Sequence, residues 1–460
     1  MQTSKGLMSR IATCCFAVTL LIAFDALITF VRMPYGTKSQ VSWVDYGQVP
    51  DGELDTIIIG TSTIMAGLDP QVLNNRLGAT AYNLGSPTQW IEESYIALKT
   101  AYEDHHVTRA ILGITHVSAS REGVPNTGST FMFMRSLQVS PKQNFEAYSY
   151  LLTECDTIGK PESLGFIAPW AYGSVDNDLT DLYTNVKMKL DGTTLYEAAR
   201  ISDHRWAYQG NGFGPYNANV KYDWVGPYYR MDDIADDVDN LGSSVIDPSR
   251  EAALIKLCNY CEEHDIELIA VVVPIPAYRI IEYGKGYEVL DDAMKKFFEE
   301  HGAQFYDFNL ARPELMDLST EIFGDTEHLN TVGAEAFSQA FCDVVESVQA
   351  GNDVDDLFWT IEDYLRSVDY IAAVFLDREP HEDGIHLRAR AMAGSDVDVE
   401  YQFMVKAGET WVVVRDWSRD NTFVYYPENG RRGEVTLCVN ARQVGSDEEY
   451  ERYRVIQAMY

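Results

Sequence analysis

Residues 55–62 read DTIIIGTS, a short apolar run that ends in glycine and is followed closely by a serine. Three consecutive isoleucines are typical of a strand that is buried on both faces, because a half-solvated strand would alternate apolar and polar side chains. The glycine permits a sharp turn where the strand ends. We therefore expect residues 55–60 to form a buried strand, with Ser62 on the turn into the next helix.

Apolar strands and amphipathic helices alternate on both sides of this stretch. The further predicted strands are residues 80–84, 109–115, 266–274 and 304–308, and the predicted helices are 70–77, 87–102, 248–264, 287–300 and 331–348. This alternation predicts an α/β fold with a flavodoxin-like, three-layer parallel sheet. Reactive groups in such sheets collect beyond the carboxyl ends of the strands, where Ser62, Gly85 and Thr115 fall.

The chain divides into three predicted parts. Residues 1–35 contain a cytoplasmic N-terminus and a transmembrane anchor, 36–351 form the α/β domain, and 352–460 form a second domain. Residues 36–54 have the composition of a linker, and the α/β pattern lapses over an insertion at about residues 118–245. The last part is predicted to be an all-β sandwich, because short runs of period two are separated by Gly, Asn, Asp and Pro turns. These runs are residues 397–405, 409–414, 422–426 and 434–440.

The apolar run at residues 11–31, IATCCFAVTLLIAFDALITFV, is long enough to span a bilayer. Lys5 and Arg10 precede it and Arg32 follows it, so the charge bias mildly favours a cytoplasmic N-terminus. No small-residue cleavage site follows the run, which favours an uncleaved anchor over a signal peptide. We therefore expect a single-pass membrane protein whose catalytic domain is extracytoplasmic.

Asp25 is unusual within this run, because a carboxylate inside a membrane span is costly. One interpretation is an acid near the outer interface that snorkels or stays protonated. The other is a contact with another membrane protein.

Composition excludes some classes of partner. The net charge of −34, with no cluster of Lys and Arg, makes nucleic-acid binding improbable and favours a neutral glycan or a small acyl donor. The seven cysteines form no disulfide framework. Cys258 and Cys261 form a C-x-x-C on a predicted helix, which indicates two helix residues or a disulfide, and zinc is poorly supported without a second Cys/His pair. We expect no metal and no other cofactor.

Two motifs carry residues suited to acyl-transfer chemistry. Ser62 has an exposed position on a strand-to-helix turn, where its backbone N–H can also stabilise an oxyanion. Asp325 and His328 lie three residues apart just before the last helix of the α/β domain. A histidine can take the proton of a serine, and an aspartate can fix the tautomer of that histidine. Taken singly, Ser62 is equally an N-cap and the D-x-x-H motif a capping aspartate beside a surface histidine.

A third motif, Asn83-Leu84-Gly85, follows the second predicted strand. A glycine there lets a backbone N–H approach a substrate carbonyl, although an ordinary turn glycine is the simpler alternative.

In this order and βα context, the three motifs resemble those of the SGNH (GDSL-like) hydrolase superfamily over about residues 50–350. The resemblance implies that Ser62 is the nucleophile, His328 the base and Asp325 the residue that orients it. It also implies that the backbone amides of Ser62 and Gly85 form part of the oxyanion hole.

One feature departs from the superfamily, which usually carries an asparagine in a G-x-N-D block after the third strand. Here that strand is followed by Thr115 and His116. Loss of one oxyanion donor typically slows a reaction by about 100- to 1000-fold. Thr115 or His116 is the expected substitute, with Thr115 assigned to the oxyanion hole and His116 and Asn83 to substrate contacts. A slow or inactive site is the alternative.

The departure also points to a subgroup. A single N-terminal span, G-T-S, N-L-G and D-x-x-H-L-N resemble the extracytoplasmic SGNH-like proteins of cell-envelope acylation, including D-alanyl-teichoic-acid transfer and alginate O-acetyltransferase proteins. This resemblance implies acyl transfer to, or removal from, an envelope polysaccharide. It also implies a multispanning membrane acyltransferase as partner.

The predicted insertion is rich in aromatic residues among glycines and asparagines. Such rings suit sugar stacking, and Trp206 and Trp224 are the substrate-binding candidates; a satellite core is the alternative. The aromatic residues are Trp206, Tyr208, Tyr216, Tyr222, Trp224, Tyr228 and Tyr229.

The C-terminal part resembles triple-tyrosine-type β-sandwich modules, with Tyr401-Gln402-Phe403, Trp411, Tyr425 and Gly433 carrying the likeness. Glu434 stands where those modules usually have a tyrosine. The implied role is binding or spacing.

Two hypotheses follow for the whole chain. The first is an extracytoplasmic serine O-acyltransferase or esterase that acts on an envelope polysaccharide through Ser62, His328 and Asp325. The second is a non-catalytic SGNH-like binding or scaffold protein of an envelope acylation or glycan-assembly complex.

Overall fold

The structure is a computed structural model in which two compact units are distinguished. The first unit contains residues 1–216 and 247–270, and the second contains residues 217–246 and 271–460. The residues that the structure describes are 2–171, 175, 178–225, 245–318, 320–381, 384–426 and 433–459. Each unit is described by itself.

A five-stranded parallel sheet has the strand order β2-β1-β3-β4-β5. Its strands are β1 (Thr56–Gly60), β2 (Ala81–Asn83), β3 (Arg109–Gly113), β4 (Glu267–Val272) and β5 (Gln304–Asp307). β1 pairs in parallel with β2 and with β3, so that Ile57 lies opposite both Tyr82 and Ala110. This is the strand order of flavodoxin-like sheets, and it reverses direction between β1 and β3. The predicted α/β fold with a parallel sheet is thereby confirmed.

Five helices of the first unit follow or precede these strands. They are α2 (Lys38–Tyr46), α3 (Ser62–Gly67), α4 (Pro70–Leu77), α5 (Ile91–His105) and α12 (Pro248–Glu263). Local sequence sets their ends: Asp69 caps α4, which starts with proline, and Asp247 caps α12 in the same way. α5 and α12 are joined by a buried ion pair between Glu92 and Arg250, with 2.6 Å between Oε2 and Nη1.

The predicted linker at residues 36–54 is wrong, because this stretch contains α2. Thr37 and Gln40 form a capping box at its start. Val41, Trp43 and Tyr46 are buried in the core of the first unit. The Pro and Gly content of the stretch indicated a linker, but the packing of these three side chains against the rest of the unit stabilises a helix.

The predicted insertion is also more regular than its sequence pattern indicated. Its described part contains the helices α6 (His116–Ser120), α7 (Gly128–Ser136), α8 (Pro141–Thr153), α9 (Leu179–Asp191) and α10 (Leu195–Ser202). It also contains the 3₁₀ helices η1 (Pro161–Phe166), η2 (Pro169–Ala171) and η3 (Tyr222–Trp224). Most of the α-helices are short and capped by side chains such as Ser140 and Thr194, so local capping rather than a long apolar stripe defines them.

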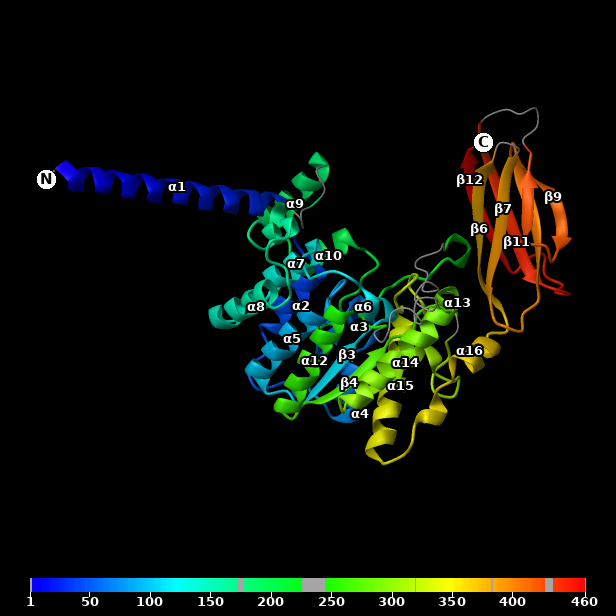
Figure 1. Cartoon of the computed structure of the whole chain (residues 1–460), viewed down its shortest axis with the longest axis horizontal. Helices are drawn as coiled ribbons and strands as arrows, with labels where there is room; N and C mark the ends of the chain where they lie inside the picture. The colour runs from blue at the N-terminus through cyan, green and yellow to red at the C-terminus, as the bar shows by residue number, and fades with distance from the viewer. Residues whose placement is uncertain are drawn as a thin grey trace. The chain divides into compact units, whose positions relative to one another are not determined.

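The N-terminal helix α1 (Gln2–Arg32) includes a segment, Arg10–Arg32, that is long and apolar enough to cross a membrane. Its mean hydropathy is 2.4, and none of its most apolar window is buried in the protein. Figure 1 shows α9 beside the C-terminal end of α1. By length and composition alone, such a helix is either a span or a signal sequence.

The second unit contains helices that follow β4 and β5. They are α13 (Ala277–Tyr283), α14 (Lys285–Glu300), α15 (Thr331–Gln349) and α16 (Ile361–Ser367), with the 3₁₀ helices η4 (Phe308–Leu310), η5 (Thr320–Ile322) and η6 (Asp355–Leu357). Asn330 caps α15, because its Oδ1 accepts the N–H of Gly333 at 3.0 Å.

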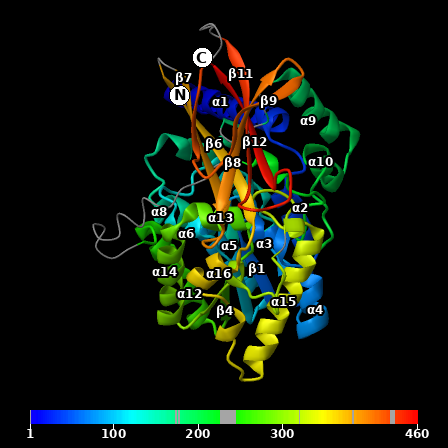
Figure 2. The ribbon, with the colours of Figure 1, turned by 90° about the vertical axis from the view of Figure 1, so that its right-hand side faces the viewer.

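Two antiparallel sheets form the C-terminal part of the second unit. Their strand orders are β10-β7-β6 and β12-β11-β8-β9. The strands are β6 (Ile371–His381), β7 (Gly384–Ala393), β8 (Val399–Ala407), β9 (Thr410–Ser418), β10 (Thr422–Tyr425), β11 (Glu434–Gln443) and β12 (Arg452–Met459). Val374 and Leu387 of one sheet share a core with Phe403 and Leu437 of the other, so the sheets form a sandwich (Figure 2). The boundary predicted near residue 352 falls within the second unit and stays a prediction.

The turn after β1 sets the first prediction. Gly60 has φ +129°, and a Cβ at this position would lie 2.1 Å from the backbone oxygen of Gly113 on β3. We expect Gly60→Ala to lower the stability of the protein by about 3 kcal/mol or more, because neither backbone can move without breaking the β1–β3 pairing.

The matched control is Gly78→Ala, where φ is also positive but no atom lies within 4 Å of the added Cβ. This control is expected to cost about 1 kcal/mol. The midpoints of thermal unfolding measure both; equal shifts for the two variants would contradict the tight approach of β1 to β3.

Candidate active site

Ser62 is the first residue of α3 and lies two residues beyond the end of β1. Thr61 precedes it with extended backbone angles, so the chain turns abruptly from strand to helix. The serine side chain is half-buried, which leaves part of it accessible. The predicted strand-to-helix turn is therefore present at Ser62.

The Asn83-Leu84-Gly85 turn packs directly against the α3 helix. Asn83 is fully buried, and its Nδ2 donates to the backbone oxygens of Ile64 at 2.9 Å and Leu68 at 3.1 Å. Its Oδ1 accepts the N–H of Gly85 at 2.9 Å. In this structure Asn83 thus supports the helix that carries Ser62, and the Gly85 amide is hydrogen-bonded within its own turn. A donor for an oxyanion has to be aimed at the reacting oxygen, so the predicted role of Gly85 requires this bond to open.

Gln89 is a supporting residue that the sequence did not single out. Its Oε1 accepts the N–H of Gly60 at 2.6 Å, and its Nε2 donates to the Leu84 oxygen at 3.0 Å. Ser86 adds a further link, because its N–H donates to the Gly60 oxygen at 3.0 Å. One buried amide side chain therefore connects the turn after β1 with the turn after β2. No motif marks it, since a glutamine at the start of a helix is common on protein surfaces.

Thr115 and His116 follow β3. The Thr115 Oγ1 accepts the N–H of Ser118 at 3.0 Å, and the Thr115 N–H donates to the Ser118 Oγ at 2.9 Å, which is a capping box for α6. The Thr115 N–H is therefore engaged in capping, whereas the Thr115 hydroxyl acts as an acceptor in the cap and keeps its own proton as a donor. His116 is buried, with 2% of its surface exposed.

In the second unit, His328 and Asp325 form a close pair. The imidazole Nδ1 of His328 lies 2.9 Å from Oδ1 and 3.1 Å from Oδ2 of Asp325. The same Oδ1 accepts the backbone N–H groups of Glu327 and His328, both at 2.9 Å. An ionised carboxylate only accepts hydrogen bonds, so Nδ1 carries a proton, and in the neutral form of the ring Nε2 is the nitrogen that accepts one. A histidine in this tautomer is suited to act as a base.

The ionisation of Asp325 follows from these contacts. Burial alone raises the pKa of Asp325, but the hydrogen bond and the charge of the His328 ring, with the two backbone donors, outweigh it and hold the pKa at about 2. Asp325 is therefore fully charged at neutral pH.

Arg279 on α13 supports the loop that carries this pair. Its guanidinium is 2% exposed, and Nη1 donates to the Thr326 oxygen at 3.1 Å and lies 3.5 Å from the Glu327 carboxylate. A buried arginine that contacts both the backbone and a side chain of a loop holds that loop at two points. The sequence gave no sign of this role, since Arg279 lies 46 residues before Asp325 on a helix with no motif.

The predicted sugar-binding aromatic residues have different outcomes. Trp206 is fully buried and packs with Val41 and Ala199, so both faces of its ring are covered. Trp206 therefore belongs to a small satellite core, which was the alternative to sugar binding. Trp224 ends η3, but its side chain lies outside the described residues, as do Tyr228 and Tyr229.

The segment that contains Trp206 nevertheless lies next to the Ser62 helix. The Asn83 N–H donates to the Asn211 oxygen at 2.9 Å, and the Gly214 N–H donates to the Met65 oxygen at 3.3 Å. Gly212 approaches so closely that a Cβ would lie 1.7 Å from the Asn83 oxygen. Part of the predicted insertion thus covers the carboxyl end of β2.

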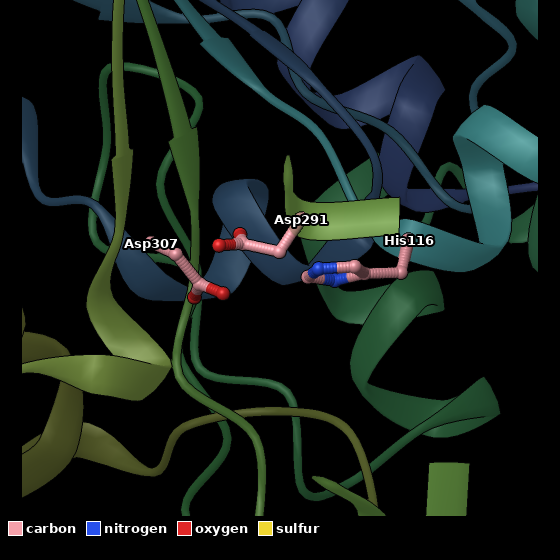
Figure 3. Close-up of side chains that lie close together, drawn as sticks. All are labelled: His116, Asp291 and Asp307. Carbon is pink, nitrogen blue, oxygen red and sulfur yellow. The ribbon is translucent and has the colours of Figure 1, made fainter. Parts of the chain in front are cut away.

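Two buried carboxylates of the second unit offer ligand atoms of the kind that metals bind. Figure 3 shows the Asp291 and Asp307 side chains directed toward each other. Burial raises the pKa of Asp291 to about 6, although its hydrogen bond with Asp307 opposes this. Asp307 also accepts the hydroxyl of Tyr287 and the N–H of Asn309. Two carboxylates that are already hydrogen-bonded provide too few ligands for zinc or calcium, and we assign no metal to this pair. The third labelled side chain, His116, belongs to the first unit.

Cys258 and Cys261 are buried in α12 as free thiols, so the disulfide interpretation of the C-x-x-C is not realised. Burial raises the pKa of each thiol to about 12, which makes both poor nucleophiles.

Comparison with known proteins gives a limited picture. No protein-family model matches the sequence, and no curated protein matches it. One similar solved structure is a protein provisionally named an acylhydrolase from Bacteroides fragilis NCTC 9343, at 6% identity and a TM-score of 0.28, covering 67% of this chain and 94% of that one. Another is a protein provisionally named a platelet activating factor from Streptococcus pneumoniae, at 12% identity and a TM-score of 0.29, covering 72% of this chain and 99% of that one. Because both TM-scores are below 0.5, neither likeness bears on the activity of this chain.

The pair of His328 and Asp325 sets a prediction about pH. Folding lowers the Asp325 pKa from its ordinary value of 3.8 to about 2, so the charged carboxylate stabilises the fold above pH 4. This contribution is lost as the pH falls through about 2. Because the side chain is 25% exposed, we expect the free energy of unfolding of wild type to exceed that of Asp325→Asn by only about 1–2 kcal/mol at pH 6.

The difference in the free energy of unfolding between wild type and Asp325→Asn is expected to become smaller as the pH falls from 6 to 3. Denaturant unfolding at several pH values measures it. Asp396→Asn, on the exposed surface of the C-terminal part, is the control and should give no pH-dependent difference. A difference for Asp325→Asn that stays constant with pH would mean that folding leaves its ionisation unchanged.

Proposed function

We propose that this chain is a membrane-anchored serine acyl-transfer enzyme, an O-acyltransferase or esterase, with Ser62 as nucleophile, His328 as base and Asp325 as the residue that orients it. The observation that carries the proposal is the His328–Asp325 pair, with Nδ1 and Oδ1 2.9 Å apart, which orients the imidazole as a catalytic pair requires. A capping aspartate would need only the two backbone N–H contacts. The additional contact with the imidazole is what a catalytic pair requires.

Ser62 supplies the second part of the argument. It follows β1 at the point where the strand order reverses between β1 and β3, which is where ligands bind in open parallel sheets. Asp325 and His328 lie in the segment of the chain between β5, which is a strand of the same sheet, and α15. We infer that the serine and the histidine act together, since carboxyl ends of parallel strands lie at one edge of a sheet.

The proposed reaction has two steps. The Ser62 Oγ attacks the acyl carbonyl while its proton passes to His328 Nε2, and the proton then passes to the departing alkoxide, which leaves as an alcohol. The ester on Ser62 is next attacked by water or by a sugar hydroxyl, whose proton is taken by the same nitrogen. The bond between Ser62 Oγ and the acyl carbon then breaks, and His328 Nε2 returns the proton to Ser62 Oγ. Water gives hydrolysis, and a sugar hydroxyl gives O-acylation.

The proposed acceptor is a neutral hydroxyl-bearing polymer of the cell envelope. The net charge of −34 repels anionic polymers unless a cation intervenes. A multispanning membrane acyltransferase remains the proposed partner and acyl source, on the strength of the motif resemblance alone.

The proposed membrane anchor draws support from the way α1 ends, and the extracytoplasmic location is proposed from the charge bias of the sequence around this helix. Asn185 Nδ2 donates to the backbone oxygens of Val31 and Met33, both at 2.9 Å, and the Tyr35 hydroxyl donates to the Thr193 oxygen at 2.8 Å. A signal peptide is removed, so a fold gains nothing from binding its end. These contacts favour retention of α1 as a span.

The non-catalytic scaffold remains the second candidate, and one observation favours it. The Gly85 N–H donates to Asn83 Oδ1, and the Thr115 N–H donates to Ser118 Oγ in the α6 cap. A binding protein has no need of free oxyanion donors. An enzyme that used either of these two amides as an oxyanion donor would have to open its bond on substrate binding.

A serine-reactive fluorophosphonate distinguishes the two candidates. We expect the probe to label the wild-type protein, Ser62→Ala to abolish labelling, and His328→Ala to slow it by about 1000-fold or more, because the serine then lacks its base. Mass spectrometry of the labelled peptide identifies the residue. Ser446→Ala, at another half-buried serine, is the control and should label normally. Labelling that persists in Ser62→Ala would exclude Ser62 as the nucleophile, and no labelling of wild type would favour the scaffold.

Transfer and hydrolysis are separated with p-nitrophenyl acetate as the donor. If the enzyme is a transferase, a neutral oligosaccharide should gain the mass of one acetyl group, and free acetate should fall by the same amount. A polyuronate of equal length should gain much less, because of its charge. Acetate release that is unaffected by any acceptor would identify an esterase.

A further inference from the structure

The last turn of α1 is bound by polar side chains of α9. Besides Asn185, Lys189 contacts this end, with Nζ 2.5 Å from the Phe30 oxygen and 2.6 Å from the Met33 oxygen. The carbonyl groups that end a helix lack partners within the helix. α9 provides donors for some of them, so these two helices are fixed to each other.

A second contact lies deeper along α1. The indole Nε1 of Trp170, on η2, donates to Asp25 Oδ1 at 2.8 Å. Asp25 precedes Arg32 by seven residues, which is about 10 Å along a helix. The segment around η2 therefore accompanies α1 well into its apolar part. Asp25 also has a partner within its own chain, which neither of our two interpretations of this residue included.

Three apolar side chains of α9 lie on its outer surface. Leu179, Tyr183 and Leu190 form one stripe by their helical spacing, and they are 82%, 66% and 72% exposed. The other apolar side chains of the helix, at positions 182, 186 and 188, are half-buried. Asn185 and Lys189 contact the end of α1. In a water-soluble protein an apolar stripe of a helix turns inward, so this exposed stripe indicates surroundings that are apolar.

The neighbouring segments show the same property. Ile167, between η1 and η2, is 79% exposed, and Leu164 and Ile201 are 60% and 61% exposed. Single exposed apolar residues are normal, but a concentration of them around one helix marks a binding surface. These residues come from the segments on either side of the Trp170 contact.

The geometry points to a membrane-embedded collar, formed by residues 158–171 and 178–201, that lies against the C-terminal end of α1 and inserts its apolar side chains into one leaflet of the bilayer. The occupant of this surface is phospholipid, because α1 is itself the element that is apolar enough to enter a bilayer and the collar is bound to its side. Interfacial helices insert to about 5–10 Å, which matches the depth of the Trp170 contact along α1. Tryptophan is also enriched at this level of membranes. The inference rests on the proposed anchorage by α1 and does not depend on the proposed chemistry.

Lipid quenching in the full-length chain tests the collar. Cys14, Cys15 and Cys155 are first replaced by alanine; the remaining cysteines are buried and unreactive toward a labelling reagent. Single cysteines are then introduced as Leu179→Cys, Leu190→Cys, Val18→Cys and Val413→Cys and labelled with the fluorophore NBD. All four positions are exposed in the structure. The proteins are reconstituted into phosphatidylcholine vesicles with or without brominated acyl chains.

We expect bromine to lower the emission at residues 179 and 190 at least about twofold, as it does at residue 18 within the span. Emission at residue 413, on β9, should respond to aqueous iodide instead. If residues 179 and 190 respond to iodide and not to bromine, the collar lies in water and the inference is wrong. If they respond to neither, another protein copy covers them, and the inference is equally wrong. An unquenched residue 18 would overturn the anchorage itself, whereas the serine-reactive probe tests the chemistry separately.

Discussion

The burial of the parallel sheet on both faces is the constraint on which the rest of the structure depends. Ile57, Ile58 and Ile59 are entirely inaccessible, so the middle of the sheet has no room for polar chemistry. Polar side chains are confined to the strand ends. There the chain has to turn sharply, and the close approach of Gly60 to Gly113 is the result. The position of Ser62 follows directly from this turn.

Much of this arrangement could be predicted from the sequence, because it rests on local patterns. The β-branched runs gave the strands of the sheet, and the capping residues and apolar spacing gave helices such as α4, α12 and α15 within a few residues. The D-x-x-H spacing also predicted a contact between Asp325 and His328, and that contact is present. Contacts between residues three apart in one loop leave the chain little freedom.

What the sequence did not predict depends on distant contacts. α2 looked like a linker because its apolar residues acquire meaning only when Trp43 and Tyr46 find partners such as Phe133 and Tyr82. β6, β7 and β12 were not predicted, since their pairing and the shared core of two sheets define them. Gln89 and Arg279 were missed for a related reason. Gln89 connects two turns and Arg279 connects α13 to a distant loop, both through buried hydrogen bonds, and no local pattern reveals which segments will meet.

The attachment of α9 to the end of α1 has a mechanical consequence. A domain joined to its membrane helix by a flexible linker samples many heights and orientations. Here Asn185 and Lys189 bind the end of α1 directly, and Met33, the residue that follows α1, is buried. With α1 in a bilayer, the first unit would stand at one fixed elevation and tilt. Ser62 would then stay at a constant distance from the lipid surface as the protein diffuses, and only chemical groups at that distance would reach it.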